Sequence, residues 1–171
     1  AESRDHVPLG KFLVNEADLV LPRIHSSDEE RRRIWSMLRA IVPSVSEKNK
    51  LVLLNPNASK LIEQRKWPLE SYAELAKKII EGREDVHVVV TGSASEYEEG
   101  EALRKMAGSA RILNLAGKTT LRELIDLCNI GEVLVTNDSG PAHFASLTDI
   151  HIMVFFGPET PKLYRPLSKN C

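Results

Sequence analysis

The stretch LVLLNPN, residues 51–57, is a short apolar run that stops at Asn-Pro, and the fold follows from it. A run of this length, bounded by turn residues, is typical of a strand buried on both faces, as in parallel sheets. Four similar runs follow it: VHVVVT (86–91), RILNL (111–115), VLVT (133–136) and IMVFF (152–156). The chain therefore contains five candidate strands for one sheet.

Helical patterns separate these strands. SYAELAKKIIEG (71–82) has apolar residues at the helical period. Ser95 with Glu98, and Thr120 with Glu123, have the spacing of capping boxes at helix starts. The alternation of strands and helices with short links predicts an α/β fold: a doubly wound, Rossmann-like parallel sheet of about five or six strands with right-handed crossovers.

The first fifty residues have a different pattern. ADLVLP (17–22) predicts an edge strand, and Ser27 with Glu30 forms a third capping box before a charged helix. PSVSEKNK (43–50) is polar and typical of a linker. We therefore expect residues 1–50 to be a connection with one helix, and residues 51–171 to be the Rossmann-like domain.

Composition excludes several classes of protein. The 171 residues are 42% hydrophobic and 27% charged, which suits a globular domain with a real core. A net charge of −1 gives no basic field that would attract nucleic acid. Cys128 and Cys171 match no metal-ligand spacing, and Cys128 falls in an apolar helical pattern that predicts packing. Because no apolar run is long enough for a membrane span and the first residues resemble no signal peptide, we expect a cytoplasmic protein.

Ligands of open parallel sheets bind beyond the carboxyl ends of the strands, so the loops after residues 54, 91, 115, 136 and 156 are the candidate site. After the fourth strand, Ser139 and Gly140 are placed to offer backbone amides to a phosphate at a helix start. His143, one turn later, is placed to face the same point. The alternative is that Asp138 is an ordinary helix N-cap.

The first two loops carry charged residues. Arg65 and Lys66 precede Trp67, and two cations at this edge suit a pyrophosphate; the alternative is a solvated basic pair beside a core tryptophan. Gly92 permits close approach of a ligand after the second strand. Glu96 is placed to accept hydrogen bonds from ribose hydroxyls, or simply to complement the charge of a helix start.

The loop AGKTT (116–120) after the third strand contains GKTT, but it is not a phosphate-binding P-loop. That motif needs a glycine five residues before its second glycine, and Ile112 stands there. The dinucleotide-binding pattern G-x-G-x-x-G is also absent.

Taken in order, the motifs resemble glycosyltransferase family 9, the ADP-heptose:lipopolysaccharide heptosyltransferases. The resemblance covers about residues 51–166 and corresponds to the carboxy-terminal, donor-binding lobe of a two-lobed GT-B enzyme; residues 1–50 resemble the inter-lobe connection only loosely. It rests on five segments: Asn55-Pro56 with the basic-Trp-Pro loop, Thr91-Gly92-Ser93, residues 115–121, Asn137-Asp138-Ser139-Gly140-Pro141-Ala142-His143 and residues 156–161.

The resemblance implies roles for individual residues. Glu96 corresponds to the acidic residue that holds the ribose, and the adenine would lie against the backbone around Lys118 and Thr119. Asp138 corresponds to the residue that contacts the sugar. His143 matches a histidine of the family.

The diphosphate contacts carry over less completely. Ser139 and Gly140 correspond to residues whose amides hold the diphosphate, whereas Pro141 has no N–H to donate. The family's phosphate-binding lysine stands two residues before the tryptophan, where this chain has Arg65, with Lys66 adjacent. Either cation is therefore a candidate for the role.

The activity that the resemblance implies is inverting transfer of heptose from ADP-heptose to the lipopolysaccharide inner core on lipid A. The catalytic base belongs to the family's amino-terminal lobe, and the full-length enzyme would make a peripheral contact with the inner membrane. No Asp-x-Asp pair occurs, so neither a metal nor another cofactor is expected. Two alternatives remain: another GT-B-like enzyme such as a sugar-nucleotide epimerase, and a non-catalytic nucleotide-sugar-binding module.

Overall fold

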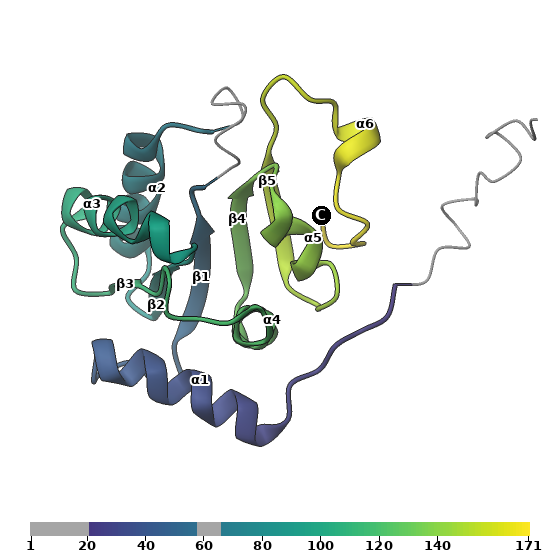
Figure 1. The fold of residues 1–171 in the computed structure, drawn as a ribbon. Helices are drawn as coiled ribbons and strands as arrows, with labels where there is room; N and C mark the ends of the chain where they lie inside the picture. Colours follow the sequence, from purple (N-terminus) through teal and green to yellow (C-terminus); the bar gives the residue numbers. More distant parts are fainter. Residues whose placement is uncertain (1–20, 58–65) are drawn as a thin grey trace, which may run out of the picture.

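Five parallel strands form one sheet in the computed structural model, which describes residues 21–57 and 66–171 (Figure 1). The sheet order is β3-β2-β1-β4-β5, and every neighbouring pair is parallel. The predicted fold class is confirmed, with boundaries that differ from the prediction by a residue or two. The strands are β1 (Lys50–Asn55), β2 (Val86–Val90), β3 (Ile112–Asn114), β4 (Val133–Asn137) and β5 (His151–Phe155).

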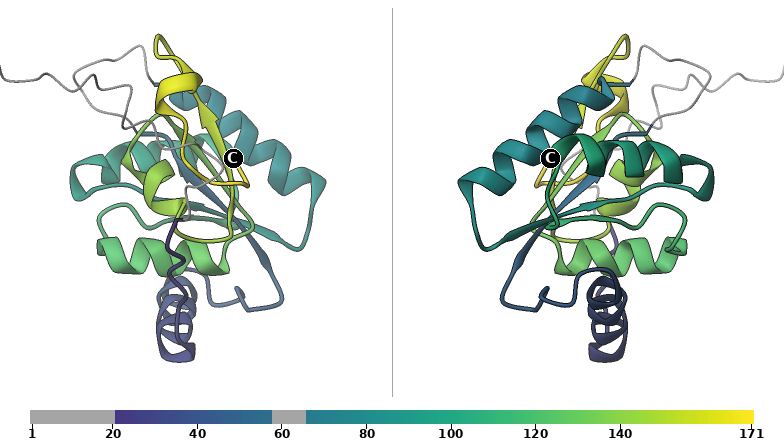
Figure 2. Two further views of the ribbon diagram at one scale, coloured as in Figure 1. Left: turned by 90° about the vertical axis from the view of Figure 1, so that its right-hand side faces the viewer. Right: turned by 90° about the vertical axis from the view of Figure 1, so that its left-hand side faces the viewer.

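Helices cover both faces of the sheet, as the term doubly wound requires (Figures 1 and 2). One face packs against α2 and α3, and the other packs against α1, α4 and α5. The helices are α1 (Asp28–Ile41), α2 (Leu69–Gly82), α3 (Tyr97–Ala107), α4 (Leu121–Ile130), α5 (Gly140–Ala145) and α6 (Pro161–Tyr164).

Alternating strand residues supply the two apolar cores. Leu53 and Leu134 pack on the α1/α4 face, and Val88 and Val90 pack on the α2/α3 face. Each fully buried leucine contributes about 1.5–3 kcal/mol through removal of apolar surface from water. Cys128 is buried in the first of these cores, which confirms its predicted packing role, and burial raises the pKa of its thiol to about 12.

The chain changes direction across the sheet between β1 and β4. β1 is followed along the chain by β2 on one side of it, whereas its other neighbour, β4, arrives only after β3. The loops that leave β1 and β4 therefore diverge to opposite faces and open a crevice at their carboxyl ends.

Two of the three predicted capping boxes are confirmed. Ser27 caps α1 with Glu30, and Thr120 caps α4 with Glu123. The box predicted at Ser95 is wrong, because α3 is preceded by a short 3-10 helix (Ala94–Glu96) that begins one turn earlier. The residues that pair there are Ser93 and Glu96.

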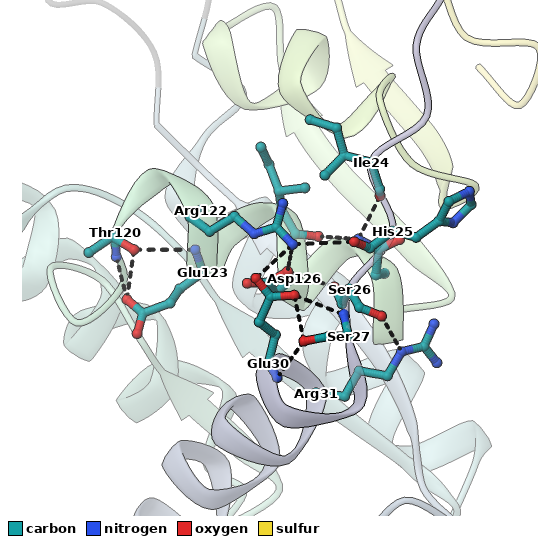
Figure 3. A network of polar contacts seen from close by, with 12 residues as sticks. Ile24, His25, Ser26, Ser27, Glu30, Arg31, Thr120, Arg122, Glu123 and Asp126 are labelled. Carbon is teal, nitrogen blue, oxygen red and sulfur yellow. Dashed lines mark hydrogen bonds and ion pairs between the residues drawn. The ribbon is translucent and has the colours of Figure 1, made fainter.

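Residues 24–26, which precede α1, contact α4 through hydrogen bonds (Figure 3). Ser26 Oγ donates to Asp126 Oδ1 at 2.6 Å. Arg122 lies between Glu30 at 2.9 Å and Asp126 at 3.1 Å. Farther along α4, Asn129 Nδ2 donates to the Ile24 carbonyl oxygen at 3.0 Å.

Residues 24–41 pack against the sheet domain, although residues 1–50 were predicted to be a separate connection. Helix α1 buries Ile34, Trp35 and Leu38 in the same core as β1. The domain boundary predicted at residue 50 stays a prediction. Of the predicted edge strand, residues 21 and 22 are not in a strand, and residues 17–20 lie outside the described residues.

His87 lies in β2 and is buried. Neither ring nitrogen has a hydrogen-bond partner among the described residues. Burial, followed by the positive charge of Arg111, holds the pKa of His87 below its ordinary value of 6.5. In the unfolded chain the imidazole regains that ordinary value, so protons bind the unfolded state first as the pH falls.

We therefore expect the free energy of unfolding to decrease as the pH falls from about 6.5 toward the folded-state pKa, and His87→Leu to remove this part of the pH dependence. Urea denaturation between about pH 7.5 and pH 5.5 measures both slopes. His25→Leu is the matched control, because His25 is exposed. An unchanged slope in the His87→Leu chain would contradict the prediction.

Candidate functional site

A cavity of about 500 Å³ opens at the carboxyl ends of β1 to β4, where the direction of the chain changes. Loops from all four strands contribute to it, as the fold rule for parallel sheets predicts. Its lining comprises Asn55, Asn57, Gly92, Ser93, Ser95, Glu96, Thr119, Thr120, Leu121, Leu124, Ser139, Gly140 and Pro141. Four predicted site residues, Glu96, Thr119, Ser139 and Gly140, are therefore brought together.

The segment after β4 presents unused backbone donors to this cavity. Among the described residues, the N–H groups of Ser139 and Gly140 donate to no protein acceptor. Ser139 is the N-cap of α5, so the alternative that Asp138 is the N-cap is wrong. Asp138 is buried, and its N–H donates to the Phe155 carbonyl oxygen at 3.0 Å.

Two glycines allow the loops after β2 and β3 to touch. The Gly117 N–H donates to the Gly92 carbonyl oxygen at 2.8 Å. Gly117 has a φ of +71°, and a Cβ there would lie 2.6 Å from Ala94 Cα. A Cβ on Gly92 would lie 2.7 Å from Asn57 Nδ2. Larger residues at either position would therefore push apart the walls of the cavity.

Glu96 combines a capping role with a place in the cavity wall. Its Oε2 accepts from Ser93 N at 2.6 Å and from Ser93 Oγ at 2.8 Å. Within the described part of the chain, Oε1 accepts no hydrogen bond. The cap therefore fixes the carboxylate in the wall and leaves one oxygen for a ligand hydroxyl.

Two asparagines in the lining, Asn55 and Asn57, were not predicted as site residues. Asn55 Nδ2 donates to Thr91 Oγ1 at 3.1 Å and joins the ends of β1 and β2. Asn57 is 5% exposed, and its Oδ1 has no partner among the described residues. The available signal was their position directly after an apolar strand at the ligand edge of the sheet.

Other predicted residues lie outside the cavity lining. Lys66 Nζ contacts Glu99 Oε2 at 3.4 Å. Lys118 lines a second cavity of about 360 Å³, and its Nζ lies 5.4 Å from the centre of the Tyr97 ring. His143 is exposed in the last turn of α5. The prediction for Arg65 falls outside the described residues.

Metal ligands and membrane spans were also sought in residues 21–57 and 66–171. No group of three or more histidine, cysteine, aspartate or glutamate side chains is placed to hold a metal ion there. None of the helices in those ranges has the length and apolarity needed to cross a membrane.

Residues 16–171 match the family model of glycosyltransferase family 9 (heptosyltransferase). The chain is 33% identical over 156 residues to lipopolysaccharide heptosyltransferase 2 of Salmonella typhimurium, covering 90% of this chain and 42% of the relative. The Escherichia coli heptosyltransferase 2 is 36% identical over 110 residues, 63% of this chain and 31% of the relative.

A solved structure gives the same result in three dimensions. The structure of E. coli ADP-heptose lps heptosyltransferase II superimposes with a TM-score of 0.77 at 30% identity, covering 89% of this chain and 44% of that one. The chain thus spans less than half the length of the relatives that it matches.

Proposed function

Because the chain belongs to glycosyltransferase family 9, the heptosyltransferases, we propose that its cavity binds the nucleotide-sugar donor, ADP-heptose, in a transfer to the lipopolysaccharide inner core. The observation that carries the proposal is the convergence of Glu96, Thr119, Ser139 and Gly140 on one cavity at the crevice of the sheet. The whole enzyme, which would act in the cytoplasm at the inner membrane, also needs the half of the protein that this chain does not span.

The lining divides into parts with different chemistry. Glu96 offers a carboxylate oxygen to ribose hydroxyls, and the backbone beside Thr119 lies where the adenine is expected. The free amides of Ser139 and Gly140 suit the diphosphate, since each N–H can donate to a phosphate oxygen. Asp138, which is adjacent to them, faces the transferred sugar in this proposal.

The reaction is a single displacement with inversion. An acceptor hydroxyl attacks the anomeric carbon, the bond from that carbon to the diphosphate oxygen breaks, and ADP leaves. The amides of Ser139 and Gly140, with Arg65 or Lys66, stabilise the charge that grows on the leaving diphosphate. The general base comes from the other half of the enzyme, and no metal is required.

Nucleotide selectivity tests this proposal. We expect the isolated chain to bind ADP more tightly than UDP or GDP, with a dissociation constant of roughly tens of micromolar to millimolar, because half of the cleft is missing. It should transfer no sugar, since donor, acceptor and base are brought together only between two lobes. Isothermal calorimetry and a transfer assay measure these outcomes. Equal binding of the three nucleotides would contradict the assignment of the adenine pocket, and transfer by these residues alone would contradict the two-lobe mechanism.

Glu96→Gln separates the binding role of Glu96 from its capping role. Glutamine preserves a capping box but removes the negative charge. We expect ADP affinity to fall about threefold to tenfold, which corresponds to the range of about 0.5–1.5 kcal/mol for an ordinary hydrogen bond, with little change in melting temperature.

Glu30→Gln is the matched control, because Glu30 forms the same box with Ser27 outside the cavity. It should leave ADP affinity unchanged. An equal loss in both variants would assign the effect to helix capping instead of ribose recognition.

A further inference from the structure

Segment 23–27, which precedes α1, bonds both to α4 and to the turn that follows α5. On the α4 side, Ser26 Oγ donates to Asp126 Oδ1 at 2.6 Å (Figure 3). Asn129 Nδ2 donates to the Ile24 carbonyl oxygen at 3.0 Å. Because Ser26 and Asp126 are both buried, their bond forms with little competition from water.

The same segment also holds the carboxyl end of α5. The Ile24 N–H donates to the Leu147 carbonyl oxygen at 2.8 Å. The Arg23 guanidinium donates to the carbonyl oxygens of Ser146, at 3.3 Å, and of Thr148. Since Ser146 is the C-cap of α5, a shift of segment 23–27 would carry this short helix with it.

The two helices that the segment joins contribute different parts of the cavity wall. Leu121 and Leu124 of α4 line the cavity, and so do Gly140 and Pro141 of α5. Both helices pack on one apolar core, whose attraction is non-directional. Among the described residues, no hydrogen bond runs directly from α4 to α5. Segment 23–27 therefore connects the two helices through hydrogen bonds to each.

Helix α1 ties the start of α4 to the same connection. Arg122 of α4 lies 2.9 Å from Glu30, which caps α1. Arg33 of α1 lies 2.9 Å from Glu123. Glu123 accepts from the Thr120 N–H at 2.8 Å, and Thr120 lines the cavity. The placement of segment 23–27 and α1 therefore reaches the cavity wall through α4.

We propose that segment 23–27 sets the spacing of α4 and α5, with Ser26 and Arg23 as positioning residues for a donor that spans both helices. The proposal rests on the proposed function of the cavity, in which the adenine lies near the start of α4 and the diphosphate at the amides of Ser139 and Gly140. Neither Ser26 nor Arg23 lines the cavity, so their effect on binding passes through the two helices.

Comparison of ADP with adenosine tests this role in the 171-residue chain. Ser26→Ala breaks the bond to α4, and Arg23→Ala breaks the side-chain bonds to the turn after α5. We expect each change to weaken ADP binding about threefold, the effect of one ordinary hydrogen bond. Adenosine does not reach the diphosphate amides and is insensitive to the spacing, so it should lose less than about 1.5-fold. Ligand-observed NMR titrations measure binding of this weakness.

The double variant tests whether the two ends of the segment act as one unit. Once one end is free, freeing the other should add little, so we expect Ser26→Ala with Arg23→Ala to weaken ADP binding by less than about fivefold. Independent effects would multiply to about ninefold and would overturn the proposal. Equal losses for ADP and adenosine would also overturn it.

Ser46→Ala and Arg83→Ala are the matched controls. Ser46 Oγ donates to Asn49 Oδ1 at 3.2 Å, and Arg83 pairs with Asp85 at 2.7 Å. Neither Ser46 nor Arg83 lines the cavity, so both variants should keep their ADP affinity. A loss as large as that of Ser26→Ala would assign the effect to general destabilisation and overturn the proposal. If the unmodified chain binds no ADP, the proposed function fails, and this proposal fails with it.

Hydrogen exchange in the unmodified chain covers the case in which the variants do not fold. Coupling is reciprocal, so saturating ADP should slow exchange of the Ile24 amide at least about twofold. The Asn49 amide, which donates to Ser46 in the turn before β1, should slow by less than about 1.3-fold. Both amides lie outside helices and strands, where exchange occurs by local opening. An Ile24 amide that exchanges equally fast with and without bound ADP would overturn the proposal.

Discussion

Replacing Gly117 with alanine should destabilise the chain by about 2–5 kcal/mol and abolish ADP binding. Two costs combine. A residue with a side chain is strained at the left-handed φ of +71°, and its Cβ would lie 2.6 Å from the backbone of Ala94. Since Ala94 begins the turn that carries Glu96, relief of the clash displaces the ribose contact. Urea denaturation and calorimetry measure the two effects.

Gly108→Ala is the matched control for Gly117→Ala. Gly108 has a similar φ of +66°, but nothing lies within 4 Å of the Cβ that alanine would add. The Gly108→Ala chain should therefore lose only the stability that backbone strain costs, about 1–2 kcal/mol, and should keep its ADP affinity. If the two variants lost equal stability, the contact between Gly117 and Ala94 would have no energetic role.

Removing the phosphate cation should cause the largest loss of affinity without a loss of stability. We expect Arg65→Ala to cost about 1.5–3 kcal/mol of ADP binding free energy, the range for hydrogen bonds to charged groups, and Lys66→Ala to cost less. The ion pair of Lys66 with Glu99 supports this ranking, because part of the lysine's charge is already directed at a protein carboxylate. Arginine also matches phosphate oxygens in pairs.

Calorimetry of Arg65→Ala and Lys66→Ala measures which cation contributes more to ADP binding. Glu99→Gln tests the role of the ion pair. Glu99→Gln frees Lys66 from its ion pair and should strengthen ADP binding slightly, because one negative charge near the diphosphate is lost. A larger loss for Lys66→Ala than for Arg65→Ala would assign the phosphate contact to Lys66.

The parallel sheet could be predicted because β1, β2 and β4 are short apolar runs that end at turn residues, and the sequence period between them is helical. Ligands of open parallel sheets bind beyond the carboxyl ends of the strands, and this rule pointed to Glu96, Ser139 and Gly140, which lie in the cavity lining. These features depend on residues that are neighbours along the chain.

The sequence failed to predict two kinds of feature, the exact start of a helix and the contacts between distant segments. One error was local: the capping box lies at Ser93 instead of Ser95, because two serines of equal propensity stand only two residues apart and the 3-10 turn Ala94–Glu96 uses the first. The hydrogen bonds that join Asn137 to Pro56 and Trp67 depend on the pairing of β1 with β4, and no local pattern records that pairing. The adenine contact expected from the backbone around Lys118 and Thr119 stays a prediction; the side chain of Lys118 turns toward Tyr97.

The central position of β1 in the sheet also governs when the donor site can form during folding. Pro56 and Asn137 are 81 residues apart in sequence, so the crevice between β1 and β4 requires closure of a long loop. Closing it has an entropic cost that the more local pairing of β1 with β2 avoids in part. On a ribosome, β1 and β2 can pair while β4 is still unsynthesised, and a nascent chain stopped before Val133 would have three strands of the sheet but no diphosphate pocket.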